Sequence, residues 1–153
     1  MKKLMILGLL FTGLCGAKAQ KLKDADVPSA VKTAFEKLYP NTKVEEWEKE
    51  GANYEAEFDH NKVETSVVID GSGKLLETET AIAATALPKA ATEYLTKNLP
   101  KSKVKEAAKI TKADGTVSYE AEVGEADYLF DANGNFLKKE VEKDAAKDAK
   151  EKK

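Results

Sequence analysis

The sequence predicts an α+β protein made of two tandem units, each with one helix packed on a roughly four-stranded antiparallel sheet. Three observations favour this fold class. They are a repeat at an offset of about 60 residues, a helical pattern of apolar residues that opens each copy, and alternating apolar and charged residues after it. We therefore expect the first unit in residues 20–80 and the second in residues 81–140.

The repeat consists of three blocks that keep the same order in both copies. The stretch VPSAVKTAFEKLYPNTKV from Val27 corresponds to LPKAATEYLTKNLPKSKV from Leu87. YEAEF corresponds to YEAEV, and VIDGSGKLLETE corresponds to LFDANGNFLKKE. The differences in spacing fall between predicted strands, where insertions are tolerated best. The pattern indicates the duplication of one structural unit.

Each copy opens with a helix bounded by prolines. Apolar residues of the first copy recur at helical spacing over 27–38 and form one stripe. Pro28 suits the first turn of a helix, where its missing N–H is not needed, and Pro40 prevents continuation. The second copy repeats the stripe over 87–98 and ends it with Pro100.

Alternation in YEAEF and YEAEV predicts half-buried strands. The aromatic and aliphatic residues should pack beneath the helix. The glutamates should lie on the opposite, solvated face of the sheet, which we expect to be the partner-binding surface. These glutamates are Glu55, Glu57, Glu120 and Glu122. The turns DGSG and DANG carry Asp and Gly where a short hairpin requires them.

The N-terminus is typical of a secretion signal. Lys2 and Lys3 precede an apolar run over 4–14, which is too short to span a bilayer as a helix. Ala-Lys-Ala at 17–19 then gives the pattern that a signal peptidase recognises. We expect a signal peptide over residues 1–19, cleaved near Ala19–Gln20, and a periplasmic or secreted product with no membrane span.

Lipid anchoring at Cys15 is an alternative to removal of this segment. A bacterial lipobox has a small residue before the cysteine, whereas this chain has Leu14. At the other end, residues 141–153 are almost all Lys, Glu, Asp and Ala, which predicts a charged, flexible tail with little to pack against.

Composition excludes several classes of function. The chain has 25 basic and 27 acidic residues, and every basic residue is Lys. Removal of the signal leaves 22 Lys, hence a net charge of −5. An acidic protein without Arg is not expected to bind nucleic acid. The single cysteine lies in the signal and the single histidine is His60, so we expect no disulfide, no metal centre, no cofactor and no catalytic residue set.

Taken together, these residues resemble the PepSY-like unit. The resemblance rests on Val-Pro before a helix that ends in Tyr39-Pro40, then Val44 and Trp47, then Tyr-x-Ala-x-Phe and Asp-x-x-Gly. It covers residues 27–140. Tandem copies of this unit occur in β-lactamase-inhibitor-like proteins. The resemblance implies exported, non-enzymatic domains, some of which bind or inhibit other proteins.

The second copy departs from this pattern, because Ala107 stands opposite Trp47. Trp47 either packs beneath the helix or stands exposed as an anchor for a partner, and we include it in the candidate partner-binding surface. Known inhibitory members of the family rely on disulfides, which this chain lacks. Inhibition of a β-lactamase is therefore not inferred.

We interpret the chain as an exported, non-enzymatic binding module that acts through the open sheet face on another periplasmic or secreted protein. One alternative is a structural or weakly cation-binding envelope protein, since Asp131, Asn133 and Asn135 resemble the opening of a calcium loop. Another is a hydrolase that uses Glu55 and Glu57, whose side chains emerge about 6–7 Å apart on one side of a strand.

Overall fold

The computed structural model describes residues 20–141. The predicted signal with Cys15 and the tail from residue 142 onward lie outside the described residues. The described chain divides into two compact units. Unit 1 contains residues 20–80 with Lys112–Asp114, and unit 2 contains Ala81–Thr111 with residues 115–141.

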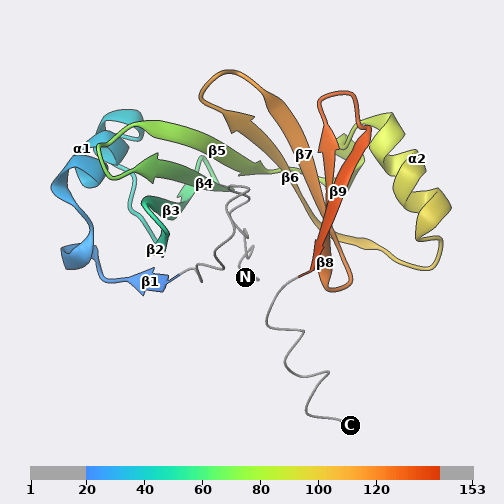
Figure 1. The fold of residues 1–153 in the computed structure, drawn as a ribbon, viewed down its shortest axis with the longest axis horizontal. Coiled ribbons are helices and arrows are strands. Elements are labelled where there is room, and N and C mark those ends of the chain that lie inside the picture. Colours follow the sequence, from blue (N-terminus) through green and yellow to red (C-terminus); the bar gives the residue numbers. More distant parts are fainter. Residues whose placement is uncertain (1–19, 142–153) are drawn as a thin grey trace, which may run out of the picture. The chain divides into compact units, whose positions relative to one another are not determined.

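Unit 1 contains one α-helix and the first five strands (Figure 1). In chain order these are β1 (Gln20–Leu22), a 3₁₀ turn (Asp24–Asp26), α1 (Ser29–Leu38), β2 (Glu46–Glu50), β3 (Asn53–His60), β4 (Val63–Asp70) and β5 (Leu75–Ala81).

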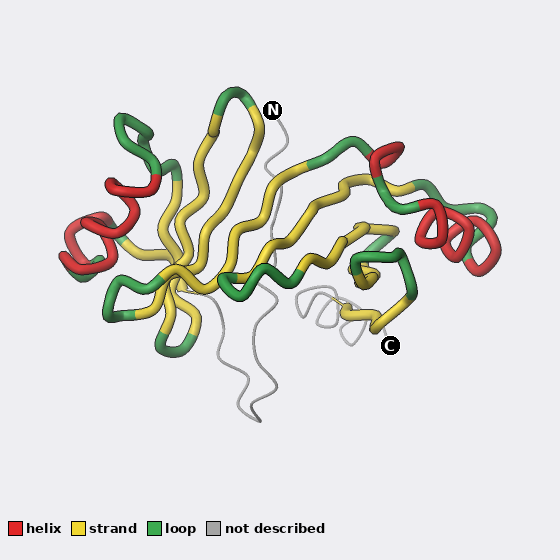
Figure 2. Tube along the Cα trace, turned by 90° about the horizontal axis from the view of Figure 1, so that it is seen from above, coloured by secondary structure: helices red, strands yellow, loops and turns green. Residues whose placement is uncertain are grey.

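Unit 2 repeats the order of helix and strands, and Figure 2 shows each helix joined to strands by loops. Its elements are a 3₁₀ turn (Ala84–Ala86), α2 (Lys89–Asn98), β6 (Val104–Lys112), β7 (Val117–Val123), β8 (Ala126–Asp131) and β9 (Phe136–Val141).

The predicted fold class is wrong in its sheets. The strands of residues 20–141 form one nine-stranded antiparallel sheet in the order β1 to β9, with only two ten-residue α-helices, instead of two sheets of about four strands. Periodicity identifies a strand and its two faces, but the backbone groups that pair along strand edges are the same in every residue. The pattern therefore gives no sign of where one sheet ends.

The core of unit 1 lies between α1 and one face of its strands. Val31 and Phe35 are the buried residues of α1. The Phe35 ring packs edge-on against Phe58 of β3, with centroids 4.9 Å apart, and against Trp47 of β2 at 5.8 Å. Val67 of β4 completes this cluster with no exposed surface. Burial of these apolar side chains is what holds the helix on the sheet.

The core of unit 2 has the same placement but takes its aromatic rings from different positions. Ala91 and Leu95 are the buried residues of α2. They belong to one cluster with Ala107 of β6 and with Tyr128 and Phe130 of β8. Because Ala107 replaces an indole, the aromatic part of this core is supplied by β8 and by Tyr94, whose ring lies edge-on to Phe130 at 5.7 Å.

The turn between β4 and β5 and the turn between β8 and β9 each pack closely against the helix of their unit. Gly73 has φ +90°, and a Cβ there would lie 2.8 Å from the carbonyl oxygen of Ala30 in α1. Gly134 has φ +85°, and its Cβ would lie 2.8 Å from the backbone nitrogen of Ala91 in α2. Glycine is therefore required at each of these turns for two reasons: it adopts the positive φ, and it has no Cβ to collide with the helix.

Candidate functional site

The strand register places all four predicted glutamates on the face of the sheet that carries no helix. In β3, Ala56 belongs to the core under α1, so its neighbours Glu55 and Glu57 point to the other side. In β7, Ala121 belongs to the core under α2, so Glu120 and Glu122 also point to the other side. We call this side the helix-free face of each unit.

The helix-free face of unit 1 has a cross-strand line of acidic residues, which we call row 1. Its members are directly opposite one another on β2, β3, β4 and β5: Glu46, Glu57, Ser66 and Glu79. Neighbouring strands lie about 4.8 Å apart. Three of the four positions are glutamate, and Glu46 stands directly opposite Glu57, an arrangement that is destabilising unless the charge is compensated.

Unit 2 has the equivalent line, which we call row 2. Its members on β6, β7, β8 and β9 are Glu106, Glu122, Asp127 and Glu140. Each occupies the position that the repeat assigns to the corresponding member of row 1. The two copies therefore keep glutamate at three of four matched positions, although much of the rest of their sequence has diverged.

Glutamates of both rows form ion pairs with lysine side chains of the same unit. In unit 1, Lys21 of β1 forms an ion pair with Glu46. In unit 2, the Lys105 Nζ lies 2.6 Å from Glu122 Oε1, and the Lys138 Nζ lies 2.6 Å from Glu140 Oε1. The ion pairs of these rows are thus made with ammonium groups of the same unit.

Glu55 is buried, in contrast to the expected solvated position. It is 1 % exposed, and its Oε1 accepts a hydrogen bond of 2.7 Å from the Ser66 hydroxyl. Its Oε2 has no hydrogen-bond partner among residues 20–141. Burial raises the pKa of Glu55 to about 8, with smaller contributions from Glu50, Glu57 and Glu48. Glu55 is therefore mostly protonated at neutral pH.

The carboxyl groups around Glu55 shift in the same direction. Burial is the main cause that raises the pKa of Glu48, which lies opposite Glu55, and of Glu50 on the same strand. Burial also raises the pKa of Glu77 on β5, against the opposing effect of Lys112. Burial therefore makes the charged form of these carboxyl groups less favourable than in water, and a cation placed beside them would oppose that effect.

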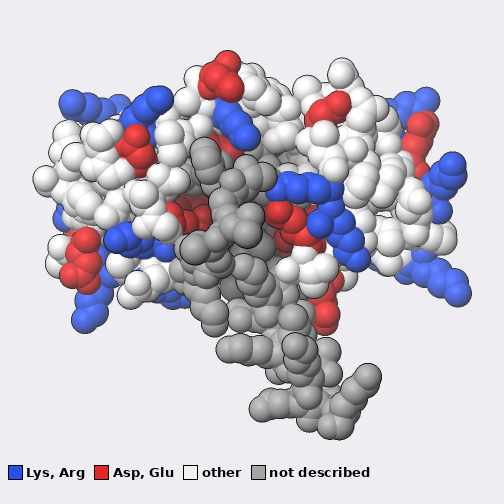
Figure 3. Space-filling model, viewed as in Figure 1, with Lys and Arg blue, Asp and Glu red and all other residues white. Residues whose placement is uncertain are grey.

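Unit 2 repeats the burial but not the whole set of carboxyl groups. Glu120 is 7 % exposed, so it too departs from the expected solvated position. Its cross-strand neighbours are Ala108 and Leu129, whereas Glu55 faces Glu48 and Val68. Figure 3 shows Asp and Glu side chains interspersed with Lys side chains over the face that it draws.

Trp47 lies on the other side of the sheet from the glutamates. It is 5 % exposed, and Phe35 of α1 packs against it. Of the two positions that the sequence leaves open, the structure shows the one beneath the helix. The indole therefore stabilises unit 1 and is not part of the helix-free face.

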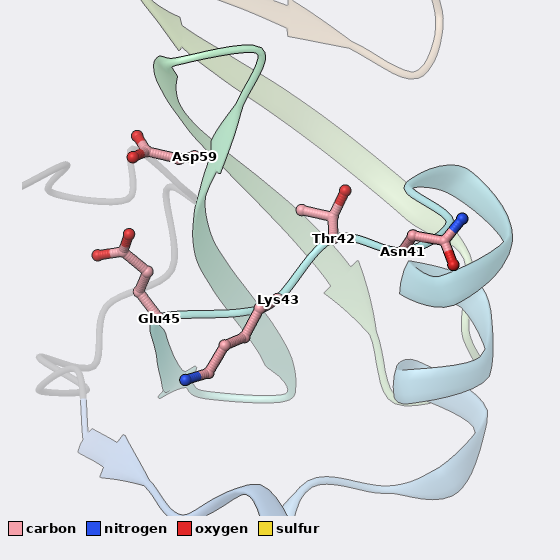
Figure 4. Close-up of a pocket in the computed structure, with 5 residues that line it drawn as sticks. All are labelled: Asn41, Thr42, Lys43, Glu45 and Asp59. Atoms are coloured by element: carbon pink, nitrogen blue, oxygen red, sulfur yellow. The ribbon is translucent and has the colours of Figure 1, made fainter.

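An open hollow of about 530 Å³ lies where the connection after α1 meets the end of β3 (Figure 4). Figure 4 shows the carboxylates of Glu45 and Asp59 pointing to the same side, while the Lys43 ammonium extends in another direction. Asn41 and Thr42 complete the lining. None of the four predicted glutamates lines this hollow.

His60 stands at the end of β3 and is exposed. Its ring packs edge-on against Tyr39, with centroids 5.2 Å apart, and Phe58 lies 6.4 Å away. These contacts are with aromatic rings and not with a nucleophile, so they describe a small aromatic cluster and do not form a catalytic triad.

The calcium-like sequence forms a hairpin turn between β8 and β9. Asp131 Oδ1 accepts hydrogen bonds from the backbone N–H groups of Asn133 and Asn135, and Oδ2 accepts one from the Asn135 side chain. These bonds lower the pKa of Asp131. Asp70 makes the matching turn in unit 1. The carboxylate is thus used to close the turn.

Residues 20–141 contain neither a metal-binding cluster nor a helix that could span a membrane. Within this range, no three or more His, Cys, Asp or Glu side chains come together in a way that would hold a metal ion. In the same range, the helices are too short or too polar to cross a membrane.

Similar proteins support the resemblance that the residues indicate. A family model described as "Putative beta-lactamase-inhibitor-like, PepSY-like" matches the chain twice, over residues 14–77 and 62–138. No curated protein sequence matches the chain.

Solved structures show the same fold. A protein of Bacteroides eggerthii, described as a "putative periplasmic" protein, has 20% identity and a TM-score of 0.66, with 75% of this chain and 88% of that chain covered. A DUF2874 family protein of Bacteroides uniformis has 21% identity and a TM-score of 0.66, with coverage of 74% and 88%. A BLIP-like protein of Bacteroides fragilis has 25% identity and a TM-score of 0.60, with coverage of 74% and 86%.

The two matches of the family model follow the two copies of the repeat, and they span most of the chain. The helix-and-strand order of both copies is the arrangement that the matched fold contains. The chain belongs to the PepSY-like, β-lactamase-inhibitor-like family, with two units in tandem.

Proposed function

We propose that the chain is an exported, non-enzymatic module that binds a basic protein through the helix-free face of its units. The observation that supports this function most strongly is the repetition of the acidic row. Glu57 and Glu122 occupy the same position in the two copies, each with glutamates at matched cross-strand positions. Opposed carboxylates weaken a sheet, so their recurrence points to a role other than stability.

The partner that suits these rows carries closely spaced Lys or Arg side chains. Lys105 of β6 pairs with Glu122 of the neighbouring strand β7, which supports the view that row 2 accommodates an ammonium group from another strand. Row 2 carries a carboxyl group on each strand, about 4.8 Å apart, and Glu106, Glu122 and Glu140 are partly exposed to a basic segment laid across the strands. Asp127 is buried, as are Ser66 and Glu79 of row 1. Complementary charge of this kind speeds association and selects the partner.

The N-terminal segment supports an extracytoplasmic site of action. We propose that cleavage near Ala19–Gln20 releases the two units and the tail over 141–153, and that the partner is another periplasmic or secreted protein. The descriptions of similar solved structures as periplasmic agree with this location. The cation-binding alternative has no such support, because Asp131 is engaged in its turn.

The test measures binding of a fluorescent eight-lysine peptide by anisotropy over a range of salt concentrations. The variant combines Glu57→Gln and Glu122→Gln. The matched control combines Glu36→Gln in α1 and Glu93→Gln in α2, which removes the same net charge from the helix side.

The unmodified protein should bind the peptide, with an affinity that falls as salt rises. The row variant should bind about 10-fold more weakly, which corresponds to about 1.4 kcal/mol. The control should stay within about 2-fold of the unmodified protein, because long-range charge is screened. An equal loss in both variants would show that net charge, and not the rows, attracts the peptide.

A further inference from the structure

The last strand presents an open edge. β9 ends the order of strands, and within residues 20–141 it pairs with β8 alone. Of the five large apolar side chains that are exposed in the described part of the chain, three lie on it: Phe136 at 37 %, Leu137 at 56 % and Val141 at 53 %. An edge of six residues with exposed apolar side chains is a template for another strand.

The first copy shows what this kind of edge accepts. Leu137 corresponds to Leu76 of β5 in the repeat. The Leu76 carbonyl oxygen accepts a hydrogen bond of 2.8 Å from the backbone N–H of Ala113, which also belongs to unit 1. The outer edge of β5 is therefore covered by backbone, and Leu76 is only partly exposed. The equivalent edge of β9 lacks such a cover among the described residues.

The opposite end of the sheet is protected differently. β1 has only three residues, and its centre is Lys21. Short length and a lysine are both features that keep an edge from pairing with another chain. β1 also covers the outer edge of β2, with Lys21 opposite Glu48. β9 of one copy therefore cannot pair with β2 of another copy. β9 of the second copy remains as the edge with which it can pair.

We propose that two copies of the chain associate by antiparallel pairing of β9 with β9 about a two-fold axis at Lys139. This register sets Leu137, the residue at which the β8–β9 ladder shifts register, opposite Val141 of the second copy, twice, so that the two most exposed apolar residues of the strand cover each other. It also sets Lys138 opposite Glu140, twice. The strand is thus self-complementary in both shape and charge, as a two-fold interface requires.

The lysine at the axis does not oppose this register. Its Nζ lies over the ring of Tyr128 on β8, 5.5 Å from the centroid, and so points back over its own sheet. The two ammonium groups are therefore drawn away from the axis. A single pair of edges buries less surface than the roughly 1,200–2,000 Å² of stable complexes, so the dimer should dissociate at low concentration.

The first experiment is sedimentation velocity of the exported protein from about 10 to 500 µM, a range suited to a weak interface. The interface variant combines Leu137→Lys and Val141→Lys. The control combines Leu38→Lys and Val63→Lys, which are also exposed, at 44 % and 39 %, but lie outside β9.

The unmodified protein and the control should show a dimer that grows with concentration, and the interface variant should remain a monomer with unchanged circular dichroism. A monomer at every concentration for the unmodified protein would overturn the proposal. Loss of the dimer in the control as well would do the same, because that loss would place the interface elsewhere.

The second experiment tests the register. After removal of residues 1–19 the chain has no cysteine, so Lys139→Cys introduces a single thiol at the axis. Under mild oxidation this variant should form a disulfide-linked dimer at least 10-fold faster than Val63→Cys, which lies on an exposed position of β4. Equal rates for the two variants would rule out pairing at Lys139.

Discussion

The two units have the same order of helix and strands but differ in the side chains that form their cores. In the core of unit 1 the rings of Phe35, Trp47 and Phe58 are in contact. Unit 2 has Leu95 and Ala107 at the positions of Phe35 and Trp47, and its core rings belong to Tyr94, Tyr128 and Phe130. The acidic rows, in contrast, match in the two copies. Cores therefore tolerate changes that conserve packing, while the helix-free face has kept its charges within one chain.

The core difference should appear most strongly in stability. Phe35→Ala should lower the free energy of unfolding by about 4 kcal/mol, because it removes the ring that Trp47 and Phe58 enclose. Leu95→Ala in unit 2 should cost about 3 kcal/mol. Urea unfolding followed by Trp47 fluorescence and by far-ultraviolet circular dichroism measures both. A larger loss for Leu95→Ala would contradict the expectation that the Phe35 ring contributes more to the free energy of unfolding than Leu95 does.

The hairpin glycines should behave alike in the two units. Gly73→Ala and Gly134→Ala should each lower the free energy of unfolding by about 2–3 kcal/mol, from unfavourable φ and from collision with the helix backbone. Gly115→Ala is the control, since φ is +86° there and nothing lies within 4 Å. It should cost only about 1 kcal/mol, which is the conformational part alone. Equal losses at all three positions would exclude the collision.

Glu55 should give the protein a stability that depends on pH. Its pKa is about 8 in the folded chain, against 4.5 for an exposed glutamate. The folded state therefore binds this proton more tightly, and its contribution is fully present below pH 4.5 and is lost as the pH rises through about 8. Glu55→Gln should raise the free energy of unfolding at pH 9 by roughly 2 kcal/mol and flatten its fall from pH 5.

The matched control for Glu55 is Glu122→Gln in unit 2, which removes a carboxyl that is paired with Lys105. Urea unfolding at pH 5, 7 and 9 should show the pH slope of the unmodified protein in this control. If Glu55→Gln leaves the slope unchanged, burial of Glu55 is not its source.

The smallest effect should come from the ion pairs of the rows. Lys105→Met should lower the free energy of unfolding by about 0.5 kcal/mol, because the pair with Glu122 is partly exposed and water screens it. A double-mutant cycle with Glu122→Gln measures the coupling. A coupling above about 2 kcal/mol would mean that the pair behaves as a buried one.

The sequence predicted the sheet face on which the four glutamates lie, but not their surroundings. The alternation of YEAEF and YEAEV places Glu55 and Glu120 on the helix-free face, because side chains alternate along any strand. The alternation within one strand does not indicate which side chains of the neighbouring strands lie beside it. Glu48 and Ser66 come next to Glu55 only through the register, so the burial and the raised pKa of Glu55 had no local signal.

The position of Trp47 likewise could not be decided from the sequence alone. Its charged neighbours in EEWEK suit either an exposed anchor or a buried residue on a half-buried strand. The pairing of Trp47 with Ala56 and its contact with Phe35 decide the matter, and both partners are distant in sequence or belong to another element.

The sequence by itself determined the duplication, the two helices with their proline boundaries, the faces of the strands and the glycines of the turns. Each of these follows from residues close together in the chain, through periodicity, ring geometry or φ. Only the tertiary structure decided that one nine-stranded sheet forms, that Glu55 and Glu120 are buried and that β9 is left as an edge. These features depend on pairing between distant segments, and the hydrogen-bonding groups of the backbone carry no sequence signature.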